Sequence, residues 1–420
     1  MESEIVILMK KLIYIFLFVQ MFTNAFAISS FITIALVISL LLFFLGVIKG
    51  YHTIDFKEPP FLSLFFFILL FGYIFIATGE KKTNHLILWV VPVLFYFFMF
   101  KRQLFKLFSL EQIKHNIIGV ITCGLLTACC FAIFEFVSIN IIGIELSFIP
   151  RGEVEEYTPL AMGNIRARSF MEESGQFSLY WELFAPISVY WIHHNISSNI
   201  NKIVCYLIIL IGLILCFSAF GFVCLLLWGA SLIMYKLHHA NNIRIVFSVI
   251  ICAVFLTLFI IILVPDLIEL FSYIIGGKLD PENSSHSDRA SRFEVLKYLD
   301  AVSILTGYGP NAAGTINFES SFVSFYLGVL MNTGILGLIC FCLFLFQQLK
   351  YVRKLFDSEL KFAFFLSLWF SSMHLMFVDN IYVPWLWVML ALLDVIHFKE
   401  KEQKIKRIVN ENFNNNCLLQ

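Results

Sequence analysis

Four arginines in two polar segments are the residues whose type and spacing best suit chemistry in this sequence. Arg166 and Arg168 stand two residues apart in GNIRARSFMEESGQ, so in an extended chain their side chains point the same way. Arg289 and Arg292 stand three residues apart where a helix is expected to begin. A guanidinium fork suits phosphate oxygens, and a helix N-terminus favours anions. Both pairs therefore predict anion sites, with solvated arginines, or arginines paired with nearby acids or lipid headgroups, as the alternative.

Carboxylates near these arginines are candidates for proton transfer. Glu319 stands just before an apolar run, so part of its carboxylate is expected to face a medium of low dielectric. Desolvation raises the pKa of a carboxyl group and makes it a better base near neutral pH. Glu319 is therefore the predicted general base, with a merely interfacial acid as the alternative. Glu172 and Glu173 precede another apolar run, where acids are ordinary helix-capping residues.

The composition indicates what must position these groups. The chain has 420 residues, of which 60% are apolar and 14% charged, and its mean hydropathy is +0.87. Soluble domains are about half apolar and about a quarter charged. We therefore expect an all-α polytopic membrane protein with a single integral membrane domain over residues 1–420. The net charge of zero does not indicate a nucleic-acid partner, because the charges are segregated by segment.

Apolar runs set the expected architecture, because a helix of about 20 apolar residues crosses the hydrocarbon core of a bilayer. About twelve transmembrane helices are predicted. They lie near residues 12–28, 30–48, 61–78, 86–100, 117–137, 176–192, 203–217, 219–235, 245–264, 321–346, 362–378 and 383–397.

Lysine and arginine give the predicted orientation. With both termini inside, 20 of the 29 Lys and Arg residues fall in inner segments, in agreement with the positive-inside rule. The remaining nine lie almost entirely in two long outer loops, 138–175 and 266–320. A cleaved signal peptide ending near Ala25-Phe26-Ala27 is an alternative for the first span, and it leaves this topology unchanged.

The second outer loop is expected to contain an amphipathic helix. The residues from Ser291 to Glu294 fit a capping box, and apolar residues follow at helical spacing. Gly307 is expected to end this helix, and Gly309-Pro310-Asn311 to turn the chain.

Other kinds of chemistry have no supporting motif. None of the ten cysteines lies in an outer loop, and no CxxC, HExxH, Walker A or GxGxxG motif stands in a suitable setting, so no disulfide framework, metal or cofactor is expected. Internal repeats are not evident, and few ionisable residues lie in or near the spans: Glu135, Glu182, His374, Asp379 and Asp394. Their scarcity argues against an ion-coupled carrier, which would hold charge near the membrane midplane.

Taken in their order along the chain, these features resemble the O-antigen polymerase (Wzy) and O-antigen ligase family of bacterial membrane glycan polymerases. The motifs are Arg followed by Glu-Ser-Gly in the first outer loop, and SRFEVLKYLDAV, GYGPN, ESSF and GILGL in the second loop and the span after it. The resemblance covers the topology of the whole chain and, at residue level, mainly 164–182 and 285–338. It implies a GT-C-like fold in the bacterial plasma (inner) membrane, with both termini cytoplasmic.

The resemblance also implies an activity. The family acts on undecaprenyl-pyrophosphate-linked glycans at the outer face of that membrane, so this chain would be a metal-independent glycosyltransferase that joins oligosaccharide repeat units. Arg168 (or Arg166) and Arg292 (or Arg289) would hold the donor's pyrophosphate. Ligases usually have His-Asn shortly before the glycines of the tenth span, whereas this chain has Glu319-Ser320-Ser321. The departure favours a polymerase, with Glu319 as the catalytic base.

Further contacts and partners complete this interpretation. The expected substrate-binding residues are Arg166, Arg289, Glu173, His286, Tyr308 and Asn311, with His286 as a substitute histidine and Tyr308 stacking on a sugar face. The expected partners are the lipid-linked oligosaccharide, membrane lipids, a chain-length regulator and a flippase, and no nucleic acid. A ligase that transfers the glycan to a lipid A-core acceptor and a polysaccharide flippase are the alternatives.

Overall fold

A computed structural model describes residues 4–22, 25, 32–51, 59–144, 146, 165–239, 293–318, 322, 324–379 and 383–417. Within these ranges every regular element is helical, which confirms the predicted all-helical class. Three helical runs of the described chain are long and apolar enough to cross a membrane: Lys82–Leu107, Leu110–Ile142 and Phe325–Arg353. Shorter apolar helices accompany them. The fold therefore suits a membrane protein, while the count of twelve spans stays a prediction.

Eleven of the twelve expected ranges overlap helices of the structure, and the twelfth, 245–264, lies outside the described residues. The elements are α1 Glu4–Val19, α2 Ile34–Ile48, α3 Pro60–Phe75, α4 Lys82–Pro92, η2 Val93–Met99, α5 Phe100–Leu107, α6 Leu110–Gln112, η3 Ile113–Ile117, α7 Ile118–Val137, η4 Ser138–Ile142, α8 Ser174–Asn195, α9 Asn199–Leu215, α10 Ala219–His239, η6 Phe293–Tyr298, α14 Ser303–Thr306, α15 Ala312–Thr315, α16 Phe325–Arg353, α17 Ser358–His374 and α18 Pro384–Cys417.

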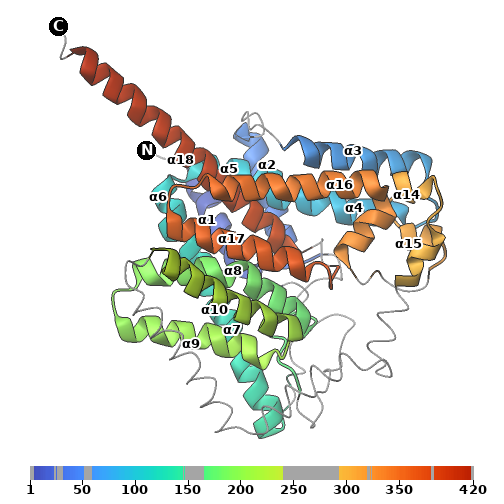
Figure 1. Cartoon of the computed structure of the whole chain (residues 1–420), viewed down its shortest axis with the longest axis horizontal. Coiled ribbons are helices and arrows are strands. Elements are labelled where there is room, and N and C mark those ends of the chain that lie inside the picture. The colour runs from blue at the N-terminus through green and yellow to red at the C-terminus, as the bar shows by residue number, and fades with distance from the viewer. Residues whose placement is uncertain are drawn as a thin grey trace.

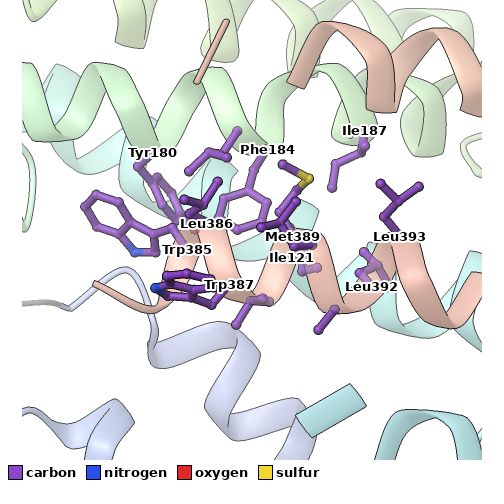
Figure 2. Close-up of a cluster of buried hydrophobic side chains, with 14 of the residues drawn as sticks. Ile121, Tyr180, Phe184, Ile187, Trp385, Leu386, Trp387, Met389, Leu392 and Leu393 are labelled. Carbon is purple, nitrogen blue, oxygen red and sulfur yellow. The ribbon is translucent and has the colours of Figure 1, made fainter. Parts of the chain in front are cut away.

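The centre of the bundle is formed around the first half of α18. In Figure 1, α16 lies along α3, while α8, α9 and α10 pack together below α17. Every residue from Trp385 to Ile396 is buried, and Figure 2 shows this run against side chains of α7 and α8. A helix that is apolar around its whole circumference must be covered on all sides. From Lys401 to Val409 the helix is rich in charged residues and exposed, and it projects from the bundle.

The long helix α16 is broken at Gly334, whose φ of 66° and ψ of −173° are not helical. The break leaves carbonyls of the preceding turn without helical partners. The amides of Tyr308 and Gly309 donate to the carbonyls of Met331 and Asn332 at 2.8 and 3.0 Å. Irregular backbone is tolerated at membrane depth where protein satisfies its polar groups. The segment 303–309 therefore completes α16 from outside the helix.

Glycine is required where this segment meets α16. A Cβ on Gly307, whose φ is 69°, would lie 2.5 Å from the backbone nitrogens of Thr333 and Gly334. Real Cβ atoms do not approach backbone so closely, and a positive φ disfavours other residues. Gly307 ends α14, as the sequence predicts.

The single amphipathic helix expected from Ser291 is divided in the structure. Its described part consists of the 3-10 helix η6 and the short helix α14, with irregular backbone between them. Asp300 causes the division, because its Oδ1 accepts the amides of Val302 and Ser303 at 2.9 and 2.7 Å and so starts a new helical turn. The expected apolar stripe is mostly exposed, and Val295 is instead the buried residue of η6.

Candidate functional site

The end of the first loop, residues 165–173, folds back into the bundle at the predicted outer end. Asn140 binds the backbone of Ile165 in both directions, at 2.9 Å through its amide nitrogen and 2.6 Å through its oxygen. The amide of Ala167 donates to the carbonyl of Leu215 at the end of α9, at 3.0 Å. The segment that carries both predicted arginines is thus attached to two helices.

Glu135 on α7 holds the tip of this segment. Its Oε2 accepts the backbone amides of Arg168 and Ser169 at 2.8 and 2.7 Å, and Glu135 is fully buried. Ser169 has a φ of 54°, and its hydroxyl donates to the carbonyl of Ala128 at 2.8 Å. Burial of a carboxylate costs free energy unless hydrogen bonds replace its lost hydration, and the two backbone amides supply such bonds here. The backbone conformation at Arg168 is therefore held by the Glu135 carboxylate of α7.

The two arginines of this loop differ in their environment. Arg168 is only 5% exposed, and its Nη1 donates to the carbonyl of Glu172 at 3.0 Å. Arg166 is half-buried and stands next to Ala167, whose amide binds the end of α9. The fold thus holds the backbone that carries both arginines, and their role in an anion site stays a prediction.

The acids at the start of α8 do not act as the caps that ordinary helix chemistry would suggest. Glu173 is the N-cap residue of α8 but makes no side-chain capping bond, and it is exposed. Glu172 accepts a bond from the side chain of Gln176 at 3.1 Å. The carboxylate of Glu173 is therefore available to a ligand at the surface.

A buried carboxylate–histidine pair lies deeper in the same region. Glu182 on α8 and His374 at the end of α17 are 0% and 3% exposed, and Glu182 Oε2 is 2.8 Å from His374 Nδ1. Ser178 donates to the other oxygen of Glu182 at 2.8 Å. The thiol of Cys224 on α10 also hydrogen-bonds Glu182. We call Glu135, Arg168, Ser178, Glu182 and His374 the loop-end cluster.

Glu182 and His374 are identified from the sequence as separate ionisable residues, and their contact is not predicted. The two residues are 192 positions apart, and no pattern links them. A second buried pair joins Lys101 to Asp394, with Nζ and Oδ2 3.4 Å apart. Buried ionisable residues are therefore more frequent in the described structure than the sequence predicts. The available signal was an ionisable residue inside an apolar run, which is expensive in a membrane and commonly functional.

The start of α16 is attached to the turn that follows His374. The amide of Phe325 lies 3.0 Å from the carbonyls of both Leu375 and Val378, and Ser324 donates to Leu375 at 3.3 Å. Asp379 follows this turn, and burial raises the pKa of its carboxyl to about 7. The structure thus brings the predicted mouth of the tenth span next to the Glu182–His374 pair.

Tyr308 and Asn311 occupy structural positions in the second loop. The Tyr308 hydroxyl donates to the carbonyl of Tyr298. Asn311 is 8% exposed, adopts a left-handed φ of 70° and precedes α15. Among the described residues, neither of the two makes a hydrogen bond to the segment 165–173. Their roles as substrate contacts stay predictions.

Four further predicted site residues lie outside the described part of the chain. They are Glu319, Arg292, Arg289 and His286. Their assignment to the site therefore stays a prediction. Among the residues that are described, no group of three or more His, Cys, Asp or Glu side chains is arranged to hold a metal ion.

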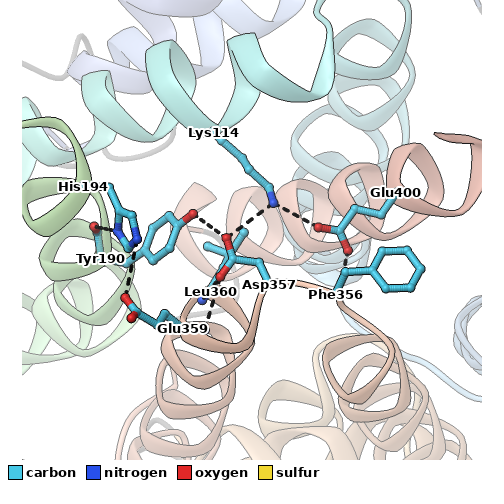
Figure 3. A network of polar contacts seen from close by, with 8 residues as sticks. All are labelled: Lys114, Tyr190, His194, Phe356, Asp357, Glu359, Leu360 and Glu400. Carbon is cyan, nitrogen blue, oxygen red and sulfur yellow. Dashed lines mark hydrogen bonds and ion pairs between the residues drawn. The ribbon is translucent and has the colours of Figure 1, made fainter. Parts of the chain in front are cut away.

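A second polar network lies at the opposite end of the bundle (Figure 3). Lys114 Nζ is 3.0 Å from Glu400 Oε1 and 3.6 Å from Asp357 Oδ2. Tyr190 donates to Asp357 at 2.7 Å, and Glu400 accepts the amide of Phe356 at 2.9 Å. We call these five residues the clamp, because they join η3, α8, α18 and the α16–α17 connection.

No protein-family model matches this chain, and a search of curated proteins finds no significant match.

Proposed function

We propose that this chain is a membrane glycosyltransferase that polymerises undecaprenyl-pyrophosphate-linked oligosaccharide units at the outer face of the bacterial plasma membrane. The observation that carries the proposal is the buried attachment of the Arg168 backbone to Glu135. A guanidinium placed in advance can stabilise negative charge as it develops, without reorganising during the reaction.

The proposed reaction needs three functions from the protein. A hydroxyl of one lipid-linked unit attacks the anomeric carbon of the chain on another, and polyprenyl pyrophosphate leaves. Arg168 and Arg292 stabilise the negative charge that grows on the pyrophosphate, with Arg166 and Arg289 beside them. The hydroxyl proton needs an acceptor, for which Glu319 is the candidate from the sequence.

The remaining proposed contacts lie around this centre. Glu173 is exposed at the start of α8 and suits a sugar hydroxyl. His286, Tyr308 and Asn311 are proposed to bind the glycan from the second loop. A chain-length regulator, a flippase and membrane lipids are the proposed partners, and both termini are proposed to be cytoplasmic.

The experiment that tests the proposal is deletion of the gene, with the surface glycan read on a gel. A lost polymerase should leave a single repeat unit on the acceptor, and the intact gene supplied in trans should restore the ladder. Complete absence of glycan would instead indicate a ligase or a flippase and would contradict the proposal.

A proton- or ion-coupled carrier is a second candidate, favoured by one specific observation. The Glu182–His374 and Lys101–Asp394 pairs are both buried within the bundle. Ionisable residues inside membrane proteins often mark ion pathways. A carrier would move the lipid-linked oligosaccharide across the membrane of liposomes containing only the purified protein, whereas a polymerase would lengthen it.

A further inference from the structure

The Glu182–His374 pair has the geometry of a proton acceptor. The contact with the Glu182 carboxylate is made by His374 Nδ1, at 2.8 Å. In a neutral imidazole whose Nδ1 carries the proton, the lone pair lies on Nε2. The carboxylate fixes this tautomer and stabilises the imidazolium that forms when Nε2 accepts a proton. Ser178 and Cys224 hold the carboxylate in turn.

The pair lies in the same region as the predicted arginines. Leu215 at the end of α9 accepts the amide of Ala167 and so anchors the arginine segment, and α9 packs against α8, which carries Glu182. His374 is the last residue of α17, and the turn after it holds the first amide of α16. The histidine is therefore linked to α8 through Glu182 and to the start of α16 through this turn.

We propose that His374, oriented by Glu182, is the base that takes the proton of the attacking hydroxyl. The inference rests on the proposed function and reassigns its proton acceptor from Glu319. The hydroxyl oxygen forms a bond to the anomeric carbon, and the bond from that carbon to the pyrophosphate oxygen breaks. Its electron pair leaves with the pyrophosphate, and the hydroxyl proton moves to His374 Nε2.

The groups that face His374 come from three helices. Glu182 faces it from α8, Phe220 packs against it from α10 with ring centroids 4.8 Å apart and ring planes tilted by 51°, and Cys224 lies beyond Glu182 on α10. Asp379 follows on the turn after α17, and the first turns of α16 carry no charged residue.

His374→Asn is the sharpest test, because the asparagine amide can still donate to Glu182 while Nε2 is lost. The purified full-length protein is reconstituted in liposomes with lipid-linked oligosaccharide extracted from the cells that make it. We expect kcat per folded molecule to fall about 100-fold or more, the typical contribution of a positioned base, with KM for the oligosaccharide nearly unchanged. Imidazole should restore part of the activity of His374→Ala, because it can take the place of the missing ring.

Two comparisons make the outcome decisive. His193→Gln, an exposed histidine of α8 away from the cluster, should keep wild-type turnover. If His374→Asn keeps kcat within about threefold, the proposal is wrong. A far larger loss in Glu319→Gln than in His374→Asn would also overturn it and return the role to Glu319. If wild-type protein itself makes no polymer, the failure belongs to the proposed function and not to the choice of base.

Discussion

Where α8 begins, the buried carboxylates of Glu135 and Glu182 hold irregular backbone and a histidine. At the other end of the same helix, the carboxylates of Asp357 and Glu400 bind a lysine and backbone amides. In the clamp, Lys114 is shared by Asp357 and Glu400, which themselves accept the amides at the start of α17 and at Phe356. In the loop-end cluster, Glu135 holds a loop and Glu182 holds His374.

The difference separates stability from function. In the clamp, ion pairs at helix ends stabilise the packing of the helices, and they need no ligand to do so. Carboxylates that fix a loop with a left-handed serine and a buried arginine maintain an arrangement that folding alone does not favour. We therefore expect changes in the clamp to reduce stability and changes in the loop-end cluster to reduce activity.

The prediction with the largest expected effect concerns membrane topology, because each reporter fusion reports either the inside or the outside. Reporter fusions after residues 150 and 285 should report the outside, and fusions after 110, 240 and 355 the inside, because Lys and Arg concentrate in the latter segments. An inside signal after residue 150 would put the loop-end cluster on the wrong side for the proposed substrate, and an inside signal after residue 285 would do the same for the second loop.

Arg168→Ala should produce the largest kinetic effect. Loss of one group that stabilises developing charge costs about 3–4 kcal/mol, so polymer formation should fall about 100- to 1000-fold. Arg168→Lys should recover only part, since an ammonium lacks the bidentate fork. Arg353→Ala, an exposed arginine at the far end of α16, is the control. Wild-type polymer length from Arg168→Ala would contradict the role given to this residue.

Glu135→Gln should produce a smaller loss of turnover. The glutamine keeps the size of the side chain but offers the amides of Arg168 and Ser169 a neutral acceptor, and charge-assisted bonds are about twice as strong as neutral ones. We expect kcat to fall about tenfold, equivalent to about 1.4 kcal/mol, with the thermal midpoint nearly unchanged. A large drop in stability with full activity would instead place Glu135 with the clamp residues.

Lys114→Met should show the opposite pattern. Hydrogen bonds to charged groups contribute about 1.5–3 kcal/mol, and Lys114 is a quarter exposed, so we expect the low end of that range. Thermal unfolding in detergent should occur at a lower temperature, while turnover per folded molecule stays at the wild-type level. A selective loss of turnover would show that the clamp is coupled to the chemistry.

The smallest expected effect is the pH dependence of the clamp. Burial acts to raise the pKa of Asp357, but bonds from Tyr190 and Leu360 and the charge of Lys114 lower it overall. A carboxyl with a depressed folded pKa contributes stability above its unfolded value of about 3.9, and that contribution is lost as the pH falls through the folded value. Melting temperatures below pH 4 should therefore drop more steeply for wild type than for Asp357→Asn; parallel curves would contradict this.

Apolar length predicted most helices because an uninterrupted run of that kind has few other stable forms in a membrane. The first helix was misplaced, since α1 includes Lys10 and Lys11, which the expected range 12–28 leaves out. The ammonium of Lys10 lies 5.8 Å from the ring centroid of Phe108 after α5, so a cation–π contact accommodates the lysine within the helix.

The break in α16 and the two buried pairs, Glu182–His374 and Lys101–Asp394, could not be predicted from the length of apolar runs. Gly334 lies in a run that reads as one continuous helix, and only the amides of Tyr308 and Gly309 make the break tolerable. The contact of Glu182 with His374 likewise depends on how α8 packs along α17. The anion-binding role of the loop arginines follows from their residue type and spacing without knowledge of the packing, and it stays a prediction.

The most direct test of the central claim is the fate of the lipid-linked oligosaccharide with purified protein in liposomes. We expect a ladder of longer glycans and the release of one polyprenyl pyrophosphate for each unit joined, both lost in Arg168→Ala and both retained in Lys114→Met. Intact oligosaccharide that stays at a single unit with folded wild-type protein, or a ladder that persists in Arg168→Ala, would contradict the account.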